Sequence, residues 1–506
     1  MIINALVNAR NALLVTAFLL GSLAATPALA QQAPETQPAQ SAPARALDAE
    51  TQRVLDQAQA DLQAGKLPEA IRGFEAVIAK DFTNYSAHFG LGLALYRQGD
   101  VRGAVFEFTQ LTAIDPKRFE GWFNLGVAQD RAGQLGEAAQ AFGRAVEAGK
   151  ALGLSVAELK PAYLGQARAL RAQNQYDPAA TVLRAALTDL PGDAEITALL
   201  GDSLVRANKP LEALPVLYEV LARDPANVDA LSQVADIYAA QQLPQRAVRE
   251  LDRGIESATD PKVKAQLWLK KSTLLQGREQ QGALQEALKL DPSLWAAHYN
   301  LGVSRLREGN IRGALEAFQD AFAQNPDEPR VALGLANTHD RLGNSAESGR
   351  FAAIAAKGSQ GGERLEALFL QGKSAYNQRR FPEAVEALAT VTKEQAGRAD
   401  AWFFLGIAQF NLKSFADAAS SLERARALQP TNASTVANLG AALYSAGRLP
   451  DAERVLTEAT TLDARNAVAW YNLGLALRSL GKQAEARRAL QRSADLGYAP
   501  ARDLLR

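Results

Sequence analysis

From about residue 50 onward, apolar positions recur at the three- and four-residue spacing of amphipathic helices. Each such stretch is followed by a short polar turn and a second amphipathic stretch. One position of the first stretch is glycine or alanine in twelve units, and eight of the intervals between these residues equal the spacing from Gly92 to Gly126. The set is Ala58, Gly92, Gly126, Ala167, Gly201, Ala235, Gly302, Ala336, Gly372, Gly406, Gly440 and Gly474. A fixed period of this length predicts stacked two-helix units that bury their apolar faces only against their neighbours.

A second small position lies twelve residues further on, and alanine occupies it in eleven units. These are Ala70, Ala104, Ala138, Ala179, Ala213, Ala247, Ala314, Ala384, Ala418, Ala452 and Ala486. Only Ser348 and the seventh unit depart from this pattern. Two facing small residues let paired helices approach closely, so both positions are explained by packing. The pattern predicts an all-α protein.

Three irregular segments interrupt the period. The interval from Gly126 to Ala167, between the third and fourth units, is longer than the period, with the excess near 147–160, which predicts either a lengthened helix or an edge loop. The seventh unit, near 258–282, is about four residues short. Residues 358–362 hold three glycines, which favours a hinge between a first block at 48–357, of about nine repeats, and a second block at 363–506, of about four repeats and a C-terminal cap.

Aromatic, leucine, glycine and alanine residues recur in a fixed order within the units. The fullest examples are Trp122, Leu125, Gly126, Ala138, Phe142 and Ala145; Trp402, Leu405, Gly406, Ala418, Leu422, Ala425 and Pro430; and Trp470, Leu473, Gly474, Leu477 and Ala486. This order resembles the tetratricopeptide-repeat (TPR) family over roughly residues 50–500. The resemblance implies an α–α superhelix, a TPR solenoid of about 13 helix–turn–helix repeats, whose first helices line an inner groove that binds partner proteins.

The same resemblance implies which side chains point into the groove: the residue after the first aromatic position, and those four and seven residues further on. Aromatic residues are frequent there. The candidate partner-binding residues are Phe89, Tyr96, Phe123, Phe369, Tyr376, Phe403, Ile407, Phe410, Tyr444 and Tyr471. A row of such rings along one groove favours docking of an extended or helical segment. The alternative is that each ring fills space between neighbouring first helices.

The composition argues against several classes of partner and reaction. Lysine plus arginine and aspartate plus glutamate both number 55, so no global field favours nucleic acid or an anionic membrane. The chain has no cysteine, and its three histidines lie at packing positions of different repeats without partners at metal-ligand spacing. Motifs for metal-dependent or serine hydrolysis are missing from the sequence. We therefore expect a non-catalytic protein without metal or cofactor.

Residues 1–30 read as a secretory signal peptide. A single charge at Arg10 precedes an apolar run, and Ala28 and Ala30 form a small-residue site that predicts cleavage after Ala30. Retention as an uncleaved anchor is the alternative. Residues 31–47 are rich in proline, glutamine and alanine and are expected to form a disordered linker. The mature chain is then expected to lack a transmembrane segment and to be periplasmic or secreted.

Three functions follow from this pattern. The first is a scaffold or adaptor in the bacterial cell envelope that binds protein partners of unknown identity in the groove. The second is a glycan-binding accessory of a polysaccharide export or modification system, since aromatic platforms also suit sugar rings. The third is passive structural spacing.

Overall fold

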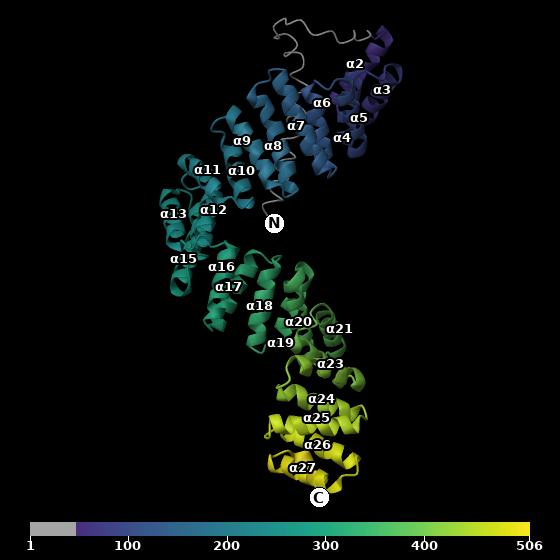
Figure 1. Ribbon diagram of the computed structural model, residues 1–506, viewed down its shortest axis with the longest axis vertical. Coiled ribbons are helices and arrows are strands. Elements are labelled where there is room, and N and C mark those ends of the chain that lie inside the picture. Colours follow the sequence, from purple (N-terminus) through teal and green to yellow (C-terminus); the bar gives the residue numbers. More distant parts are fainter. Residues whose placement is uncertain (1–46, 506) are drawn as a thin grey trace. The chain divides into compact units, whose positions relative to one another are not determined.

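The computed structural model describes residues 47–505, so the expected signal peptide and nearly all of the expected linker lie outside the described residues. Residues 47–505 form helices joined by short turns, without a strand. Two compact units divide the chain: unit 1 ends at Ala247, and unit 2 begins at Val248. Within each unit, pairs of helices follow one another along the chain (Figure 1).

In unit 1 the helices are α2 (Ala49–Gln63), α3 (Leu67–Lys80), α4 (Tyr85–Gln98), α5 (Val101–Ile114), α6 (Phe119–Arg131), α7 (Leu135–Ala151), α8 (Val156–Ala172), α9 (Tyr176–Asp189), α10 (Ala194–Arg206), α11 (Pro210–Arg223) and α12 (Val228–Ala240). Helix α13 (Pro244–Ser257) contains the boundary between the units.

In unit 2 the helices are α14 (Pro261–Ser272), α15 (Gly277–Leu290), α16 (Trp295–Arg307), α17 (Ile311–Gln324), α18 (Pro329–Arg341), α19 (Ser345–Gly358), α20 (Gly361–Asn377), α21 (Phe381–Glu394), α22 (Ala399–Asn411), α23 (Phe415–Leu428), α24 (Ala433–Ser445), α25 (Leu449–Leu462), α26 (Ala467–Ser479), α27 (Gln483–Asp495) and α28 (Ala499–Leu505). Helices α2 to α27 form thirteen pairs, and α28 follows the last pair. This confirms the predicted all-α fold of about 13 repeats.

The turn inside each pair has the same backbone conformation. In every one of the twelve units with a small residue in the first helix, the residue seven positions later has a positive φ, as at Gly99 (φ 96°) after Gly92. Five of these turn residues are not glycine: Asn174, Asn208, Gln242, Arg379 and Lys413. A left-handed residue ends the first helix and lets the chain reverse, so the helical period and the turn are set by one pattern.

Glycines in the first helices make room for large side chains of the second helices. The ring of Phe318 lies between Gly302 and Gly334, and a Cβ atom at these glycines would come within 2.7 Å and 2.8 Å of it. Leucine takes the place of the ring later in unit 2, where a Cβ at Gly440 would lie 2.4 Å from Leu456 Cγ. These close approaches explain the periodic recurrence of glycine by packing.

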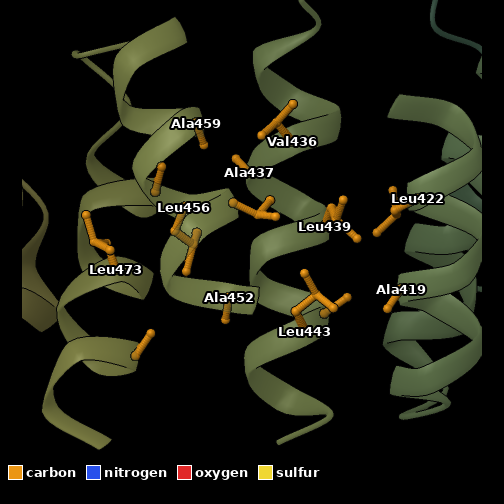
Figure 2. Close-up of a cluster of buried hydrophobic side chains, with 14 of the residues drawn as sticks. Ala419, Leu422, Val436, Ala437, Leu439, Leu443, Ala452, Leu456, Ala459 and Leu473 are labelled. Atoms are coloured by element: carbon orange, nitrogen blue, oxygen red, sulfur yellow. The ribbon is translucent and has the colours of Figure 1, made fainter. Parts of the chain in front are cut away.

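The core of unit 2 runs continuously through its C-terminal repeats. Leu422 of α23 and Leu439 of α24 face each other, and Leu456 of α25 lies on the other side of α24 (Figure 2). Each of these leucines is fully buried. Helix α24 therefore packs against both the preceding and the following helix, as expected when single repeats cannot bury their apolar faces alone.

The long interval between the third and fourth units lengthens helices. Both α7 and α8 have 17 residues, whereas their counterparts in neighbouring repeats have 13 or 14. Ser155 caps α8 and forms a reciprocal pair with Glu158, which fixes the start of the longer helix. In the short seventh unit, α14 has 12 residues.

The segment in which a hinge was expected, residues 358–362, lies within unit 2, which begins at Val248. There, α19 and α20 pack directly against each other, and Ser359 between them is buried. Gly361 has a φ of 55°, so this glycine serves a tight turn between two packed helices.

The first aromatic position of a repeat is tied to the loop before it. Trp122, Trp402 and Trp470 donate their indole Nε1–H to the carbonyl oxygen six residues earlier, at 2.8, 2.9 and 3.1 Å. His88 and His298 use Nε2 for the same contact, both at 3.0 Å. These two histidines therefore stand at a packing position of the repeat.

Ser348, which replaces the packing alanine in the ninth unit, is 1% exposed, and its Oγ finds no hydrogen-bond partner. A buried unpaired hydroxyl destabilises the folded state, and serine also has a lower helix propensity than alanine. We expect Ser348→Ala to raise the free energy of unfolding by about 1 kcal/mol, measured by urea denaturation. Ser421→Ala is the matched control, because the buried Ser421 Oγ donates to Gln409 Oε1 at 2.7 Å. A similar gain in both variants would contradict this account.

His88 forms a buried ion pair with Glu107, with 2.6 Å between Nδ1 and Oε2. Both ring nitrogens face acceptors, since Nε2 contacts the Phe82 carbonyl oxygen. Burial lowers the pKa of His88, but the hydrogen bonds to Glu107 and Phe82, with the charges of Glu107 and Asp81, outweigh it, so the net pKa is raised. The pair therefore stabilises the fold fully below about pH 6.5, and this stability is lost as the pH rises through the raised pKa.

We expect the difference in unfolding free energy between the wild type and Glu107→Gln to be largest below about pH 6.5 and to shrink above it. Urea denaturation at several pH values measures this difference. Asp320→Asn is the control, because the Asp320 carboxylate 3.7 Å from His298 is exposed and such pairs contribute little. A difference that grows with pH would contradict stabilisation by protonated His88 paired with Glu107.

Candidate binding surface

The first helices lie on the inner side of unit 2. Consecutive first helices contact each other directly, from α16 to α18 and onward through α20, α22 and α24 to α26. Consecutive second helices of the same repeats make few contacts or none. Since helices on the inner side of a curved stack approach one another more closely, unit 2 curves toward its first helices.

An aromatic cluster around Phe404 joins two of these helices, α20 and α22. Its ring centroid lies 6.0 Å from Phe369, 5.8 Å from Tyr376 and 5.5 Å from Phe403, each in an edge-to-face arrangement. Such pairs stabilise packing beyond the area that they bury. The other three rings are among the candidate residues predicted from the sequence, but Phe404, directly after Phe403, is not. The two adjacent phenylalanines of this first helix could have indicated it.

Three of the ten candidate residues are buried. Phe123 and Phe369 are 6% exposed and Ile407 is 7% exposed. The guanidinium of Arg398 lies 3.8 Å from the Phe369 ring centroid and is held there by Glu366 at 2.7 Å. These three side chains fill space between helices, as in the alternative interpretation.

The other seven candidates are half-buried. They are Phe89, Tyr96, Tyr376, Phe403, Phe410, Tyr444 and Tyr471. In unit 2, Tyr376, Phe403, Phe410 and Tyr444 pack against the same core cluster, while Tyr471 packs against Tyr498 with 5.1 Å between ring centroids. Each ring is thus fixed on one side by the core and partly accessible on the other. We define Tyr376, Phe403, Phe410, Tyr444 and Tyr471 as the aromatic row of unit 2.

The tyrosines of this row keep their hydroxyl groups available. Within residues 47–505, the phenolic oxygens of Tyr376, Tyr444 and Tyr471 make no hydrogen bond that meets normal geometry. Nearby, Lys373 of α20 pairs with Asp340 of α18 at 2.8 Å, and its ammonium lies 5.9 Å from the Phe404 ring. The surface therefore offers ring faces, hydroxyl groups and one cation held by its pair.

Unit 1 begins with rings of the same kind. Phe89 lies 6.5 Å from Phe108 between ring centroids, and Arg131 covers the Tyr96 ring at 4.7 Å. Phe123 stacks on Phe119 at 5.4 Å. The aromatic candidates of unit 1 are therefore partly covered by neighbours of their own unit.

A polar network follows along α8, α10 and α12. Arg168 pairs with Glu195 at 2.8 Å, Arg171 pairs with Asp202, and Gln233 donates to Asp202 Oδ1 at 3.1 Å. Burial lowers the pKa of the Arg171 guanidinium, and Asp202 opposes this shift. These charged groups pair with one another. The first helices of unit 1 thus carry apolar side chains early in the unit and polar side chains in α8, α10 and α12.

Within residues 47–505, histidine, aspartate and glutamate side chains nowhere gather in threes with the geometry of a metal site. Nor does any helix in the same range have the length and apolar character to cross a bilayer.

Fold and surface together define an α-helical repeat scaffold that presents a row of side chains along its first helices. Family models described as tetratricopeptide repeat match residues 55–116, 101–151, 164–228 and 369–433. Further models of the same description match residues 204–267, 305–357 and 412–473, and residues 467–496. The chain belongs to the tetratricopeptide-repeat family. It is a protein–protein interaction scaffold.

A relative and two solved structures share local or partial similarity. A TPR repeat-containing protein of Pseudomonas aeruginosa is 38% identical over 72 residues, which are 14% of this chain and 69% of that protein. The APC/C hetero-tetramer Cut9-Hcn1 is 14% identical, with a TM-score of 0.35, covering 90% of this chain and 96% of that one. YrrB, a TPR protein with an unusual peptide-binding site, is 20% identical with a TM-score of 0.34, covering 37% and 94%. TM-scores below 0.5 do not establish a shared overall arrangement.

Proposed function

We propose that this scaffold works in the bacterial cell envelope and binds an extended or helical segment of a partner protein along the aromatic row of unit 2. The row itself carries the proposal. Its five rings stand on four first helices of one unit, and each ring is anchored on its inner side by the core. Half-buried rings with available hydroxyl groups supply contact area at low entropic cost, which is typical of interface hot spots.

The envelope location rests on the amino-terminal sequence. Arg10, the apolar run after it and the small residues Ala28 and Ala30 have the order of a cleavable export signal. Export to the periplasm or the medium would bring the aromatic row into contact with envelope proteins. Fractionation of cells and amino-terminal sequencing of the mature protein test this step, which requires Gln31 at the new terminus.

In-cell photo-crosslinking tests the partner-binding role. A benzophenone amino acid replaces Ala441 or Leu475, two accessible positions beside the aromatic row. We expect discrete protein adducts from both positions, and we expect the double substitution Phe403→Ala/Tyr444→Ala to reduce them by about tenfold or more, since hot-spot truncations cost at least ~2 kcal/mol.

The matched control removes two rings outside the row. Phe82 and Phe106 are 79% and 60% exposed in unit 1, and the double substitution Phe82→Ala/Phe106→Ala should leave the adducts unchanged. Equal loss in both double variants would refute a specific role of the row. Unchanged adducts in both would support passive spacing.

Glycan binding is the second candidate, because the aromatic row also offers the ring faces and hydroxyl groups that sugars contact. The same variants separate the two candidates. Retention of exported polysaccharide by the purified wild type, lost in Phe403→Ala/Tyr444→Ala and kept in the control, would replace the protein-partner proposal.

A further inference from the structure

A cleft of about 380 Å³ opens between α26 and α27 in the last repeat of unit 2. Its lining is mostly apolar, and it comes from Trp470, Leu473 and Leu477 of α26 together with Ala489 of α27. Trp470 is fixed by the hydrogen bond from its indole to the Ala464 carbonyl oxygen at 3.1 Å. The volume falls at the lower end of the ~300–1,000 Å³ that ligand sites occupy. The apolar part of the cleft is therefore preformed.

Charged side chains complete the lining. Arg488 and Arg492 stand one turn apart on α27 and are exposed, and Glu485 adds one carboxylate. Within residues 47–505, neither guanidinium has an ion pair, a side-chain hydrogen bond or a ring contact. The lining thus carries an excess of unpaired positive charge next to an apolar surface.

The preceding repeat satisfies its charges at the same positions. Arg454 and Glu458 occupy, one period earlier, the positions equivalent to Arg488 and Arg492. Arg454 lies 3.8 Å from Asp451, and Glu458 binds Arg426 at 2.8 Å. The last repeat therefore departs from its neighbour by leaving two cations without an internal partner.

This cleft is separate from the aromatic row. Trp470, Leu473 and Leu477 occupy one face of α26, whereas Tyr471 of the aromatic row points about 100° away around the helix axis. A molecule in the cleft therefore leaves the aromatic row uncovered.

From these observations we infer that the cleft is a second protein-binding site, whose partner segment inserts one bulky apolar side chain between flanking aspartate or glutamate residues. The apolar side chain would cover the Trp470 ring and the two leucines. The carboxylates would pair with Arg488 and Arg492, which outnumber Glu485. Charge complementarity thus selects an acidic segment with an apolar centre over a basic or wholly polar one.

A fluorescent peptide of sequence Gly-Asp-Glu-Phe-Leu-Asp-Glu is the probe, titrated against the full chain by fluorescence anisotropy at low salt. We expect saturable binding, protection of Trp470 from oxidative labelling, and a loss of about tenfold or more in affinity in Arg488→Gln/Arg492→Gln. A peptide with lysine at the four acidic positions should not bind. One with serine in place of phenylalanine and leucine should bind at least about tenfold more weakly.

The control Arg424→Gln/Arg487→Gln removes the same charge from two exposed arginines that do not line the cleft. It should weaken binding by less than about twofold. Phe403→Ala/Tyr444→Ala should also bind the probe as the wild type does, so failure of this site and failure of the aromatic row are distinguishable.

Several results would overturn the inference. These are no binding by the wild type, equal loss in both arginine double variants, equal binding of the lysine peptide, or Trp470 labelling that the probe does not change. Vesicles of phosphatidylcholine with phosphatidylglycerol form the last arm. Vesicle binding that needs Arg488 and Arg492 and displaces the peptide would assign the cleft to a membrane surface instead.

Discussion

Phe318→Ala is expected to lower the free energy of unfolding by about 3–5 kcal/mol. The Phe318 ring is 1% exposed and fills the space between Gly302 and Gly334. Two backbones line this space, so neither side can move a side chain in to fill the cavity that truncation leaves. Because each repeat is stabilised by its neighbours, the loss should also loosen the repeats on either side.

Urea denaturation followed by circular dichroism measures this loss, and hydrogen exchange of residues 295–341 locates it. Phe106→Ala is the control, because that ring is 60% exposed on a second helix of unit 1. It should change stability by less than about 0.5 kcal/mol. A loss below about 1 kcal/mol in Phe318→Ala would mean that the ring does not hold the two first helices apart.

The second large effect is expected from adding one methyl group. In Gly90→Ala the new Cβ would lie 2.2 Å from Cζ of Phe74, whose side chain is fully buried. The ring is enclosed by the core, so the ring must be displaced or α4 must shift away from α3. We expect a loss of about 3 kcal/mol in the free energy of unfolding, measured by urea denaturation.

The same substitution at Gly282 provides the contrast. Gly282 lies inside α15, and a Cβ there would meet nothing within 4 Å. Gly282→Ala should therefore stabilise the protein by about 0.5–1 kcal/mol, since alanine is the better helix former. Destabilisation by both substitutions would indicate a general cost of side chains in these helices and would contradict the packing explanation for Gly90.

The repeat pattern predicted the helices because one packing requirement recurs along the chain. Gly92 and Ala104 are small where two helices touch, and this short-range rule is visible in the residues themselves. The division at Ala247 was not predictable in the same way. The division depends on long-range packing between helices, which has no local sequence signature. The hinge at residues 358–362 was predicted from glycine content alone.

The sequence predicted which first-helix positions carry aromatic side chains, but not how exposed those side chains are. Whether a ring at a first-helix position is reachable depends on what covers it. Arg398 covers Phe369, and the ring of Phe404 joins Phe403 to the core. Arg398 directly precedes α22 whereas Phe369 lies in α20, so this contact between successive repeats has no local signature. The aromatic row therefore remains a prediction for its role in binding, with its packing now described.

Contact between successive first helices has a mechanical consequence. In unit 2 the first helices contact one another more closely than the second helices do. A ligand that inserts side chains between first helices must therefore widen the inner spacing and straighten the stack. Linkage then works in both directions. Tension along unit 2 also straightens the stack. It would therefore raise the affinity for such a ligand, and compression would lower it.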